Sequence, residues 1–494
     1  MREADAQAAE VHRLWETGKS QEALPLARKV VATRRELLGE AHEMVANSLG
    51  RLAEYQEALG DIDGARAARQ QVVDIRVRLL GKTHWEVTDA RLALADCQRL
   101  ATLTPGSRLE LKSADQLFHE AGELRARGRF REAISPVQQS LAIRRRLLGE
   151  DHRLVADALN RLGLLYFSQL ELDQADAPYQ QAATIRKRVL GEDHPDYAES
   201  LNNLATIAMK RARPGQAEEM LKRAKEIMKT SFGEQNASYL ICLHDLAGFY
   251  HNRGDLAQAE AIMRQALGIA RTVFEPEDPM YLGFLSDLAT VLVKRADDQL
   301  GRGQYESAQR LLWERRAFEA MAYGDLDWRT TDARLDWSDA NRLARLEPDQ
   351  RRLFAESMAM LKRSEESSRR GEFRDAVDGA EEALRGLEAT LGRGNRRCLR
   401  IVDRLGVLLA RQGKLAGAES VLLRSTEAHR LALGEEHPDY AATLINLSRV
   451  YSIQRRRRSG RALGPARDGD PRDGGWRPIP ADDGGHGWPD RRAT

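Results

Sequence analysis

The apolar residues of this chain recur at the spacing of helices that bury one face. Residues 193–233 show the pattern most clearly, because they contain two apolar stripes at helical spacing. The first stripe consists of Tyr197, Leu201, Leu204, Ala205 and Ala208, and the second of Ala217, Met220, Leu221, Ala224, Ile227 and Met228. Residues 211–215 interrupt the periodicity, and Gly233 follows the second stripe, where a left-handed C-cap is typical. The pattern therefore predicts two antiparallel helices joined by a short turn.

The same helix pair is repeated along the chain. An alanine of the second helix recurs mostly at a step of 42 residues, with longer steps at three places. Its copies are Ala23, Ala65, Ala133, Ala175, Ala217, Ala259, Ala308, Ala376 and Ala418. A glycine usually stands shortly before this alanine, as Gly60 does before Ala65, and another follows at the end of the same helix, as at Gly81. One supersecondary unit copied at a fixed step predicts an all-α solenoid, which is stabilised by stacking of neighbouring units.

A second, longer offset relates the two halves of the chain. The motif Trp-x-x-Thr-Asp-Ala-Arg-Leu begins at Trp85 and returns at Trp328, and we call this offset the block offset. We infer that a block of about five pairs has been duplicated, with one helix lacking a partner in each block, near 85–101 and 328–345. We expect the two tryptophans to fill the gap that the missing helix leaves. The alternative is that each is an exposed aromatic anchor for a partner.

The pattern divides the chain into three groups of helices and a tail. The groups are residues 1–100, 101–345 and 346–454, and the first two end in an unpaired helix. Residues 455–494 are rich in glycine, proline, arginine and aspartate, and we expect them to be disordered. The break falls inside a repeat, because the next alanine is due near Gly460. The tail is either a natural extension or the product of a reading frame lost near residue 454, and we favour the second interpretation.

Composition narrows the range of functions. The net charge is only +2, and positive and negative residues alternate along the predicted helices, which argues against general binding of nucleic acid or a membrane surface. Cys97, Cys242 and Cys398 are too far apart in sequence to indicate a disulfide framework or a zinc site. No stretch approaches the about 20 apolar residues of a membrane helix, and the charged N-terminus lacks a signal-peptide core. These features predict a cytoplasmic protein.

The chain shows no pattern typical of catalysis or metal binding. No HExxH motif, phosphate-binding loop, nucleophile elbow or kinase signature occurs. Recurrent histidines stand at His42, His84, His152, His194 and His437. Each lies in its own loop about one repeat from the next, whereas zinc ligands lie about 2 Å from one ion. We interpret them as residues that begin helices, and we predict no catalytic residues, no metal and no cofactor.

Three segments resemble the tetratricopeptide repeat, in the long form found in kinesin light chains. They are the Leu-Gly-Glu-Asp-His-Pro-Asp-Tyr-Ala loop at 190–198, the helix residues 200–205, and the turn from the regularly spaced glycine to the repeated alanine. The resemblance covers roughly residues 4–454 and implies a right-handed superhelix whose first helices line a concave groove. The duplicated tryptophan helix is also similar to bacterial multi-repeat proteins, notably from planctomycetes. In some of those the repeats precede a caspase-like protease domain, which nothing in this chain matches.

A column of polar residues on the first helices provides the candidate binding site. These residues, called the polar column below, are Arg51, Arg161, Asn203, Asp245, Asp287, Arg404 and Asn446, with Asn160, Asn202 and His244 one position earlier. The resemblance places the column in the groove. An asparagine side chain both donates and accepts hydrogen bonds, so it can hold the backbone of an extended peptide without selecting its sequence.

The combined features predict a non-catalytic scaffold that binds a peptide or protein segment in the groove of a solenoid. The alternative is the sensor arm of a signalling effector, such as a caspase-like protease, whose catalytic domain is absent from this chain. A third class also stays open. An uncapped end of a solenoid exposes an apolar face, so the protein could self-associate end to end.

Overall fold

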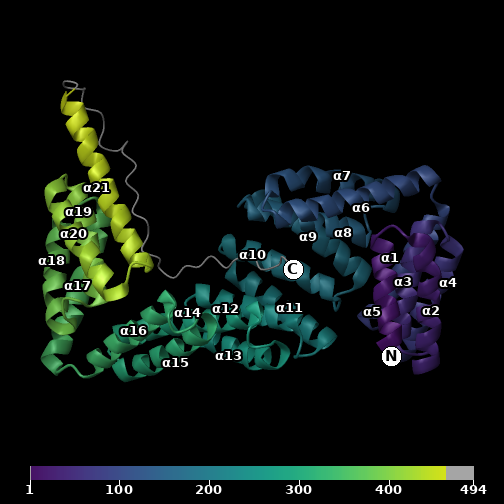
Figure 1. Cartoon of the computed structure of the whole chain (residues 1–494), viewed down its shortest axis with the longest axis horizontal. Helices are drawn as coiled ribbons and strands as arrows, with labels where there is room; N and C mark the ends of the chain where they lie inside the picture. Colours follow the sequence, from purple (N-terminus) through teal and green to yellow (C-terminus); the bar gives the residue numbers. More distant parts are fainter. Residues whose placement is uncertain (1, 463–494) are drawn as a thin grey trace. The chain divides into compact units, whose positions relative to one another are not determined.

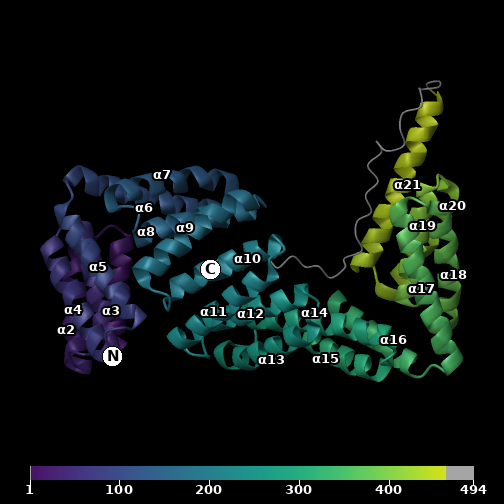
Figure 2. The same cartoon turned by 180° about the vertical axis from the view of Figure 1, so that it is seen from behind.

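A computed structural model of the protein describes residues 2–462. In this range the chain forms 21 α-helices and no strand, so the all-α prediction is confirmed (Figures 1 and 2). The helices are α1 (Arg2–Glu16), α2 (Ser20–Leu38), α3 (Glu43–Leu59), α4 (Ile62–Leu80), α5 (Trp85–Thr102), α6 (Pro105–Ala126), α7 (Phe130–Leu148), α8 (Arg153–Ser168), α9 (Leu172–Leu190), α10 (Pro195–Lys210), α11 (Pro214–Phe232), α12 (Ala237–Asn252), α13 (Leu256–Val273), α14 (Pro279–Gly301), α15 (Tyr305–Tyr323), α16 (Trp328–Ala344), α17 (Pro348–Arg370), α18 (Phe373–Leu391), α19 (Arg396–Arg411), α20 (Leu415–Leu433) and α21 (Pro438–Ala462).

The helices belong to two compact units, Met1–Phe249 and Tyr250–Thr494, and the division falls inside α12. In the first unit α2 packs against α1 and α3, and α9 packs against α8 and α10. In the second unit α18 packs against α17 and α19, and α20 packs against α19 and α21. Each of these second helices thus contacts the first helix of its own pair and that of the next pair. The single helices α5 and α16 lie at the ends of the expected groups 1–100 and 101–345.

The repeated alanines mark the closest packing within the pairs. All nine of them, from Ala23 to Ala418, have no exposed surface. Small residues on the facing first helices permit the same close approach. A Cβ atom on Gly163 would lie 2.7 Å from the ring of Tyr179, and one on Gly406 would lie 2.5 Å from the side chain of Leu422. Small residues on both helices of a pair therefore determine how closely the two helices approach.

The turn before the second helix requires a left-handed backbone in these repeats. Glycine supplies it at most positions, as at Gly60 with φ of 84°. Leu170 and Ala212 occupy the corresponding position in two repeats, and they adopt φ values of 63° and 55°. The packing of the two helices therefore imposes the turn even where the residue disfavours it, since a side chain in this conformation costs about 1–2 kcal/mol.

The recurrent histidines begin the first helices, as the sequence predicts. In all five, Nδ1 accepts a hydrogen bond from the backbone N–H two residues later, at distances between 3.0 and 3.3 Å. Since Nδ1 accepts, a neutral ring carries its proton on Nε2. In three of these histidines, Nε2 faces an aspartate on α5 or α16, the two helices that lack a partner in their pair.

The single helix α5 contacts two later pairs of the first unit. Its Asp96 lies 2.7 Å from Nε2 of His152, at the start of α8. Its Asp89 lies 3.3 Å from Nε2 of His194, at the start of α10. The Trp85 ring stands edge-on to His194, and its Nε1 donates to the carbonyl of Ser231 in α11 at 3.4 Å. Trp85 is thus half-buried against a pair that follows much later in the sequence.

The single helix α16 repeats this arrangement in the second unit. Its Asp332 accepts from Nε2 of His437 at 2.9 Å and pairs with Arg396 at 2.7 Å. The Trp328 ring also stands edge-on to His437, with the ring centroids 6.0 Å apart. His437 thus contacts α16 as His194 contacts α5, and the block offset relates the two sets of contacts. We call α5 and α16 the bracing helices. Trp85 thus packs against the residue that begins α10 and against the end of α11, and Trp328 packs against the residue that begins α21. That the tryptophans replace a missing partner helix stays a prediction.

The last helix extends further than the sequence analysis predicts. Helix α21 continues to Ala462, although disorder is expected from residue 455. Arginine favours helix, so the run from Arg455 to Arg458 prolongs it, and Gly460 is the first strong helix breaker. Residues 463–494 lie outside the described part, so their expected disorder stays a prediction. Within residues 2–462, no helix combines the length and apolar character needed to cross a membrane.

Candidate protein-binding site

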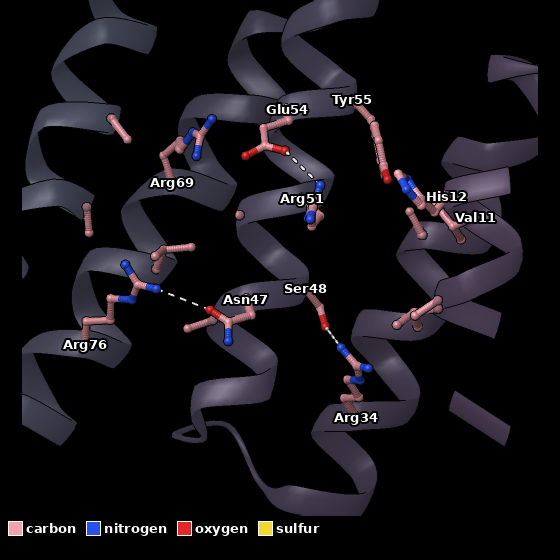
Figure 3. A pocket seen from close by; sticks show the side chains of 18 of the residues that line it. Val11, His12, Arg34, Asn47, Ser48, Arg51, Glu54, Tyr55, Arg69 and Arg76 are labelled. Carbon is pink, nitrogen blue, oxygen red and sulfur yellow. Dashed lines mark hydrogen bonds and ion pairs between the residues drawn. The ribbon is translucent and has the colours of Figure 1, made fainter. Parts of the chain in front are cut away.

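A cavity of about 780 Å³ lies among the first five helices and the first residue of α8, in the first unit (Figure 3). We call it the N-terminal cavity. First helices α1 and α3 and bracing helix α5 supply most of its wall, and α2 and α4 contribute side chains that reach between them. Five arginines line it, namely Arg34, Arg51, Arg69, Arg76 and Arg153. The lining includes two carboxylates, Glu54 and Asp89. Carboxylates just outside it pair with four of the arginines, namely Asp5 with Arg34, Glu57 with Arg69, Glu43 and Glu86 with Arg76, and Asp96 with Arg153.

Most of these arginines are already held by neighbouring side chains. Arg34 donates to Ser48 Oγ at 2.7 Å and to Asp5 at 2.8 Å, and Arg76 donates to Asn47 at 3.2 Å. Arg69 makes a two-pronged contact with Glu57. Arg51 differs, because its side chain is 67% exposed and its carboxylate neighbour, Glu54, is 3.9 Å away. Arg51 is therefore the cavity arginine best placed to accept an incoming anionic group (Figure 3).

Apolar side chains form the inner surface of the N-terminal cavity. Val11, Val30 and Val72 are nearly fully buried at its base. Tyr55 also lines it and packs against Trp15, with the ring centroids 4.4 Å apart. Burial raises the pKa of the Tyr55 phenol above its ordinary value, so the hydroxyl stays protonated and can donate a hydrogen bond. The cavity thus combines an apolar base with an exposed arginine, Arg51, which we call its cationic rim.

Of the predicted polar column, only Arg51 lines the N-terminal cavity. Asn160, Asn202 and Asn203 are instead buried between first helices. Nδ2 of Asn203 donates to Oδ1 of Asn160 at 2.8 Å, which joins α10 to α8. Nδ2 of Asn202 donates to Asp245 at 3.1 Å, which joins α10 to α12. The column does form a ladder, but burial leaves the three asparagine side chains little surface for a ligand.

The remaining members of the polar column have separate environments. The guanidinium of Arg161 stacks over the ring of Phe118 at 4.2 Å, and burial lowers its pKa. His244 lies 3.6 Å from Asp245, and Arg404 pairs with Glu365. Asp287 and Asn446 are half-buried on α14 and α21. A ligand-binding role for these residues stays a prediction.

An arginine that sequence reasoning did not identify recurs in second helices α2, α4, α7 and α9 of the first unit. It stands three helical turns after the repeated alanine, at Arg34, Arg76, Arg144 and Arg186, and we call this set the arginine column. Arg144 bonds Asp115 on the first helix of its own pair and the Leu154 carbonyl on the next first helix. Arg186 does the same with Asp157 and the Asp196 carbonyl. The spacing from the alanine is visible in the sequence and would have revealed the column.

The repeats match known family models. Residues 121–188, 171–230, 196–272 and 398–459 match a model described as tetratricopeptide repeat, and residues 11–43 and 45–86 match a second model with the same description. The chain belongs to the tetratricopeptide repeat family. The predicted resemblance is thereby confirmed, and the arginine column and bracing helices are features of a tetratricopeptide solenoid.

Several solved structures are similar to this tetratricopeptide repeat protein. The putative kinesin light chain repeats of Podosopora anserina are 23% identical, cover 45% of this chain and 99% of their own, and give a TM-score of 0.37. BtubC (BKLC) from P. vanneervenii is 20% identical over 53% of this chain and 92% of its own, with a TM-score of 0.34. A Rap protein complexed with Competence and Sporulation Factor is 13% identical over 92% and 99%, with a TM-score of 0.36. No curated protein sequence matches the chain.

Proposed function

We propose that this tetratricopeptide repeat protein is a non-catalytic scaffold, and that the N-terminal cavity binds an extended segment of a partner protein. The observation that carries the proposal is the cationic rim around an apolar base, which lies between consecutive first helices. Such a surface suits a peptide that places apolar side chains inward and charged ones on the rim. The described residues include no feature that favours the alternative of a sensor arm for an absent effector domain.

The charges on the rim define the chemistry of the segment. Four of the five lining arginines already pair with a carboxylate, so the exposed Arg51 is the one that favours a glutamate or aspartate side chain of the ligand. The exposed Arg51 is available at once, whereas Arg34 and Arg76 would exchange a present partner for a ligand carboxylate. Val11, Val30 and Val72 offer an apolar base for one or two leucine-sized side chains. The expected ligand is therefore an extended acidic peptide with interspersed apolar residues.

Fluorescence anisotropy with a labelled peptide tests this proposal. The probe is a short peptide of alternating glutamate and leucine, and its matched control replaces every glutamate with lysine. We expect the acidic peptide to bind the protein, the basic one not to bind, and added salt to weaken the complex. Arg51→Glu should abolish binding. Its control is Arg66→Glu on α4, which also removes an exposed arginine with a carboxylate three residues away but lies outside the cavity.

Two outcomes would contradict the proposal. Equal binding of the acidic and basic peptides would show that the cationic rim does not select the ligand. Undiminished binding to the Arg51→Glu protein would place the site elsewhere. Arg51 is exposed, so the variant is expected to fold normally, and far-ultraviolet circular dichroism checks this point.

A further inference from the structure

Helix α21, in the second unit, leaves an apolar face uncovered. Leu444, Ile445 and Tyr451 are 40%, 41% and 43% exposed, and Ala441 and Ser448 on the same face are exposed as well. The block offset supplies an internal reference for this face. The corresponding positions of α10 are Ala198, Leu201, Asn202, Ala205 and Ala208, and none of these side chains is more than 7% exposed. One sequence pattern is thus buried in one copy and exposed in the other.

Helix α10 shows what normally covers this face. Ala198 and Leu201 pack in one cluster with Ala224 and Ile227 of second helix α11 and with Cys242 of α12. The described residues include no second helix after α21.

We propose that the exposed face of α21 binds α21 of a second copy of this chain, in an antiparallel helix pair centred on Ser448. A small residue at the centre lets two helices approach closely, as Gly163 does within its own pair. A twofold axis through Ser448 places Ile445 of each copy opposite Tyr451 of the other. The two large apolar residues that flank Ser448 thereby cover each other.

The charges at the two ends of α21 fit this arrangement. Glu435 and Glu436 precede the helix, with Glu436 exposed, and Arg455 and Arg456 are exposed near its other end. An antiparallel pair brings the arginines of one copy within side-chain reach of the glutamates of the other. A parallel pair would instead place like charges together. The interface is a single pair of helices, so its area falls at the low end for specific complexes and the dimer should form in a concentration-dependent manner.

This inference is independent of the proposed peptide site, because α21 and the N-terminal cavity belong to different units. Sedimentation velocity of the full chain over a wide range of concentration tests it directly. We expect the mass to rise from monomer to dimer. Ile445→Glu should keep the protein monomeric, whereas its control Leu109→Glu, which changes a 70% exposed leucine on α6, should still dimerise.

Cross-linking and charge reversal test the geometry of the pair. Ser448→Cys should form an intermolecular disulfide under mild oxidation, whereas Ser452→Cys, one turn away from the axis, should form much less. The native thiols do not interfere, because all three are buried and burial raises the pKa of Cys97 to about 11 and of Cys398 to about 12. Reversing both arginines to glutamate should weaken the dimer, and reversing Glu435 and Glu436 to arginine in the same chain should restore it.

Each contrary result would overturn the proposal. A monomeric mass at every concentration would exclude self-association through α21. A dimer that persists in the Ile445→Glu protein would use another surface. Equal disulfide formation by the two cysteine variants would contradict a twofold axis at Ser448.

Discussion

Replacing Arg186 with methionine should measurably destabilise the first unit. Arg186 is only 4% exposed on α9, and its guanidinium connects three helices. It donates to the carbonyl of Asp196 at 2.9 Å, to Ser200 Oγ at 3.1 Å, to Glu199 at 3.3 Å and to Asp157 at 2.9 Å. Methionine retains most of the buried aliphatic volume but removes all four hydrogen bonds. The substitution therefore isolates the polar contribution of the arginine column.

The expected loss of stability follows from the exposure of these partners. Removing one member of a buried ion pair typically costs about 3–5 kcal/mol, because the other member stays buried and unpaired. Here the side chains of Asp157 and Glu199 are 35% and 43% exposed, so water can replace the lost contact. The carbonyl of Asp196 and the hydroxyl of Ser200 are less accessible and lose a charged donor. We therefore expect a loss of about 2 kcal/mol in the free energy of unfolding.

Urea unfolding, followed by circular dichroism, measures this loss, and hydrogen exchange locates it. Protection should fall mainly in α8, α9 and α10, which Arg186 joins. The control is Arg188→Met on the same helix, where the side chain is 57% exposed. A surface change of this kind should alter stability by less than about 0.5 kcal/mol. If the two variants unfold at the same urea concentration, the arginine column contributes no stability and our argument from burial is wrong.

Three further substitutions test other features by thermal unfolding. Leu170→Gly should stabilise the protein by about 1 kcal/mol, because glycine adopts the left-handed φ of 63° without strain; the expectation fails if Leu170→Ala stabilises equally. Gly163→Ala should cost about 1–3 kcal/mol, because the new Cβ would lie 2.7 Å from the Tyr179 ring. Gly50→Ala, with no atom within 4 Å, should not destabilise, and equal losses would refute the packing argument. Burial raises the pKa of Asp339 to about 6. The folded protein is therefore most stable when this carboxyl is protonated, and this stabilisation is lost as pH rises through about 6. Asp339→Asn should therefore raise the melting temperature more at pH 8 than at pH 4, and a uniform shift would show that this carboxyl does not titrate as described.

The repeat itself could be predicted in detail because it depends on local spacing. The buried alanines, the glycine turns and the histidine caps all follow from residues within one unit, and the structure confirms each. The bracing contacts could not be predicted in this way. Asp89 and His194 are brought together by several intervening helices, and no local pattern encodes that distance. Their joint recurrence at the block offset, as Asp332 and His437, was the only available signal.

The candidate site was predicted less well, for a physical reason. A polar residue on a helix can face a groove or a neighbouring helix, and sequence spacing does not distinguish the two. Asn203 turned out to face Asn160, whereas Arg51 faces the N-terminal cavity. Arg34 and Arg76 reach the cavity from second helices, because an arginine side chain is long enough to extend between two first helices. Which residues line the cavity depends on the length and direction of their side chains. The repeat pattern does not contain this information.

The bracing helix α5 affects how the first unit should lose its structure. In a simple solenoid each repeat touches only its neighbours, so unfolding can begin at an end and spread one repeat at a time. Helix α5 instead bonds the starts of α8 and α10 and the end of α11. Before α10 and α11 could fray, their contacts with α5 would have to break, although two helix pairs, α6–α7 and α8–α9, lie between α5 and α10 in the sequence. Helices α5 to α11 should therefore unfold together, and this part of a repeat protein should show the cooperativity of a globular domain.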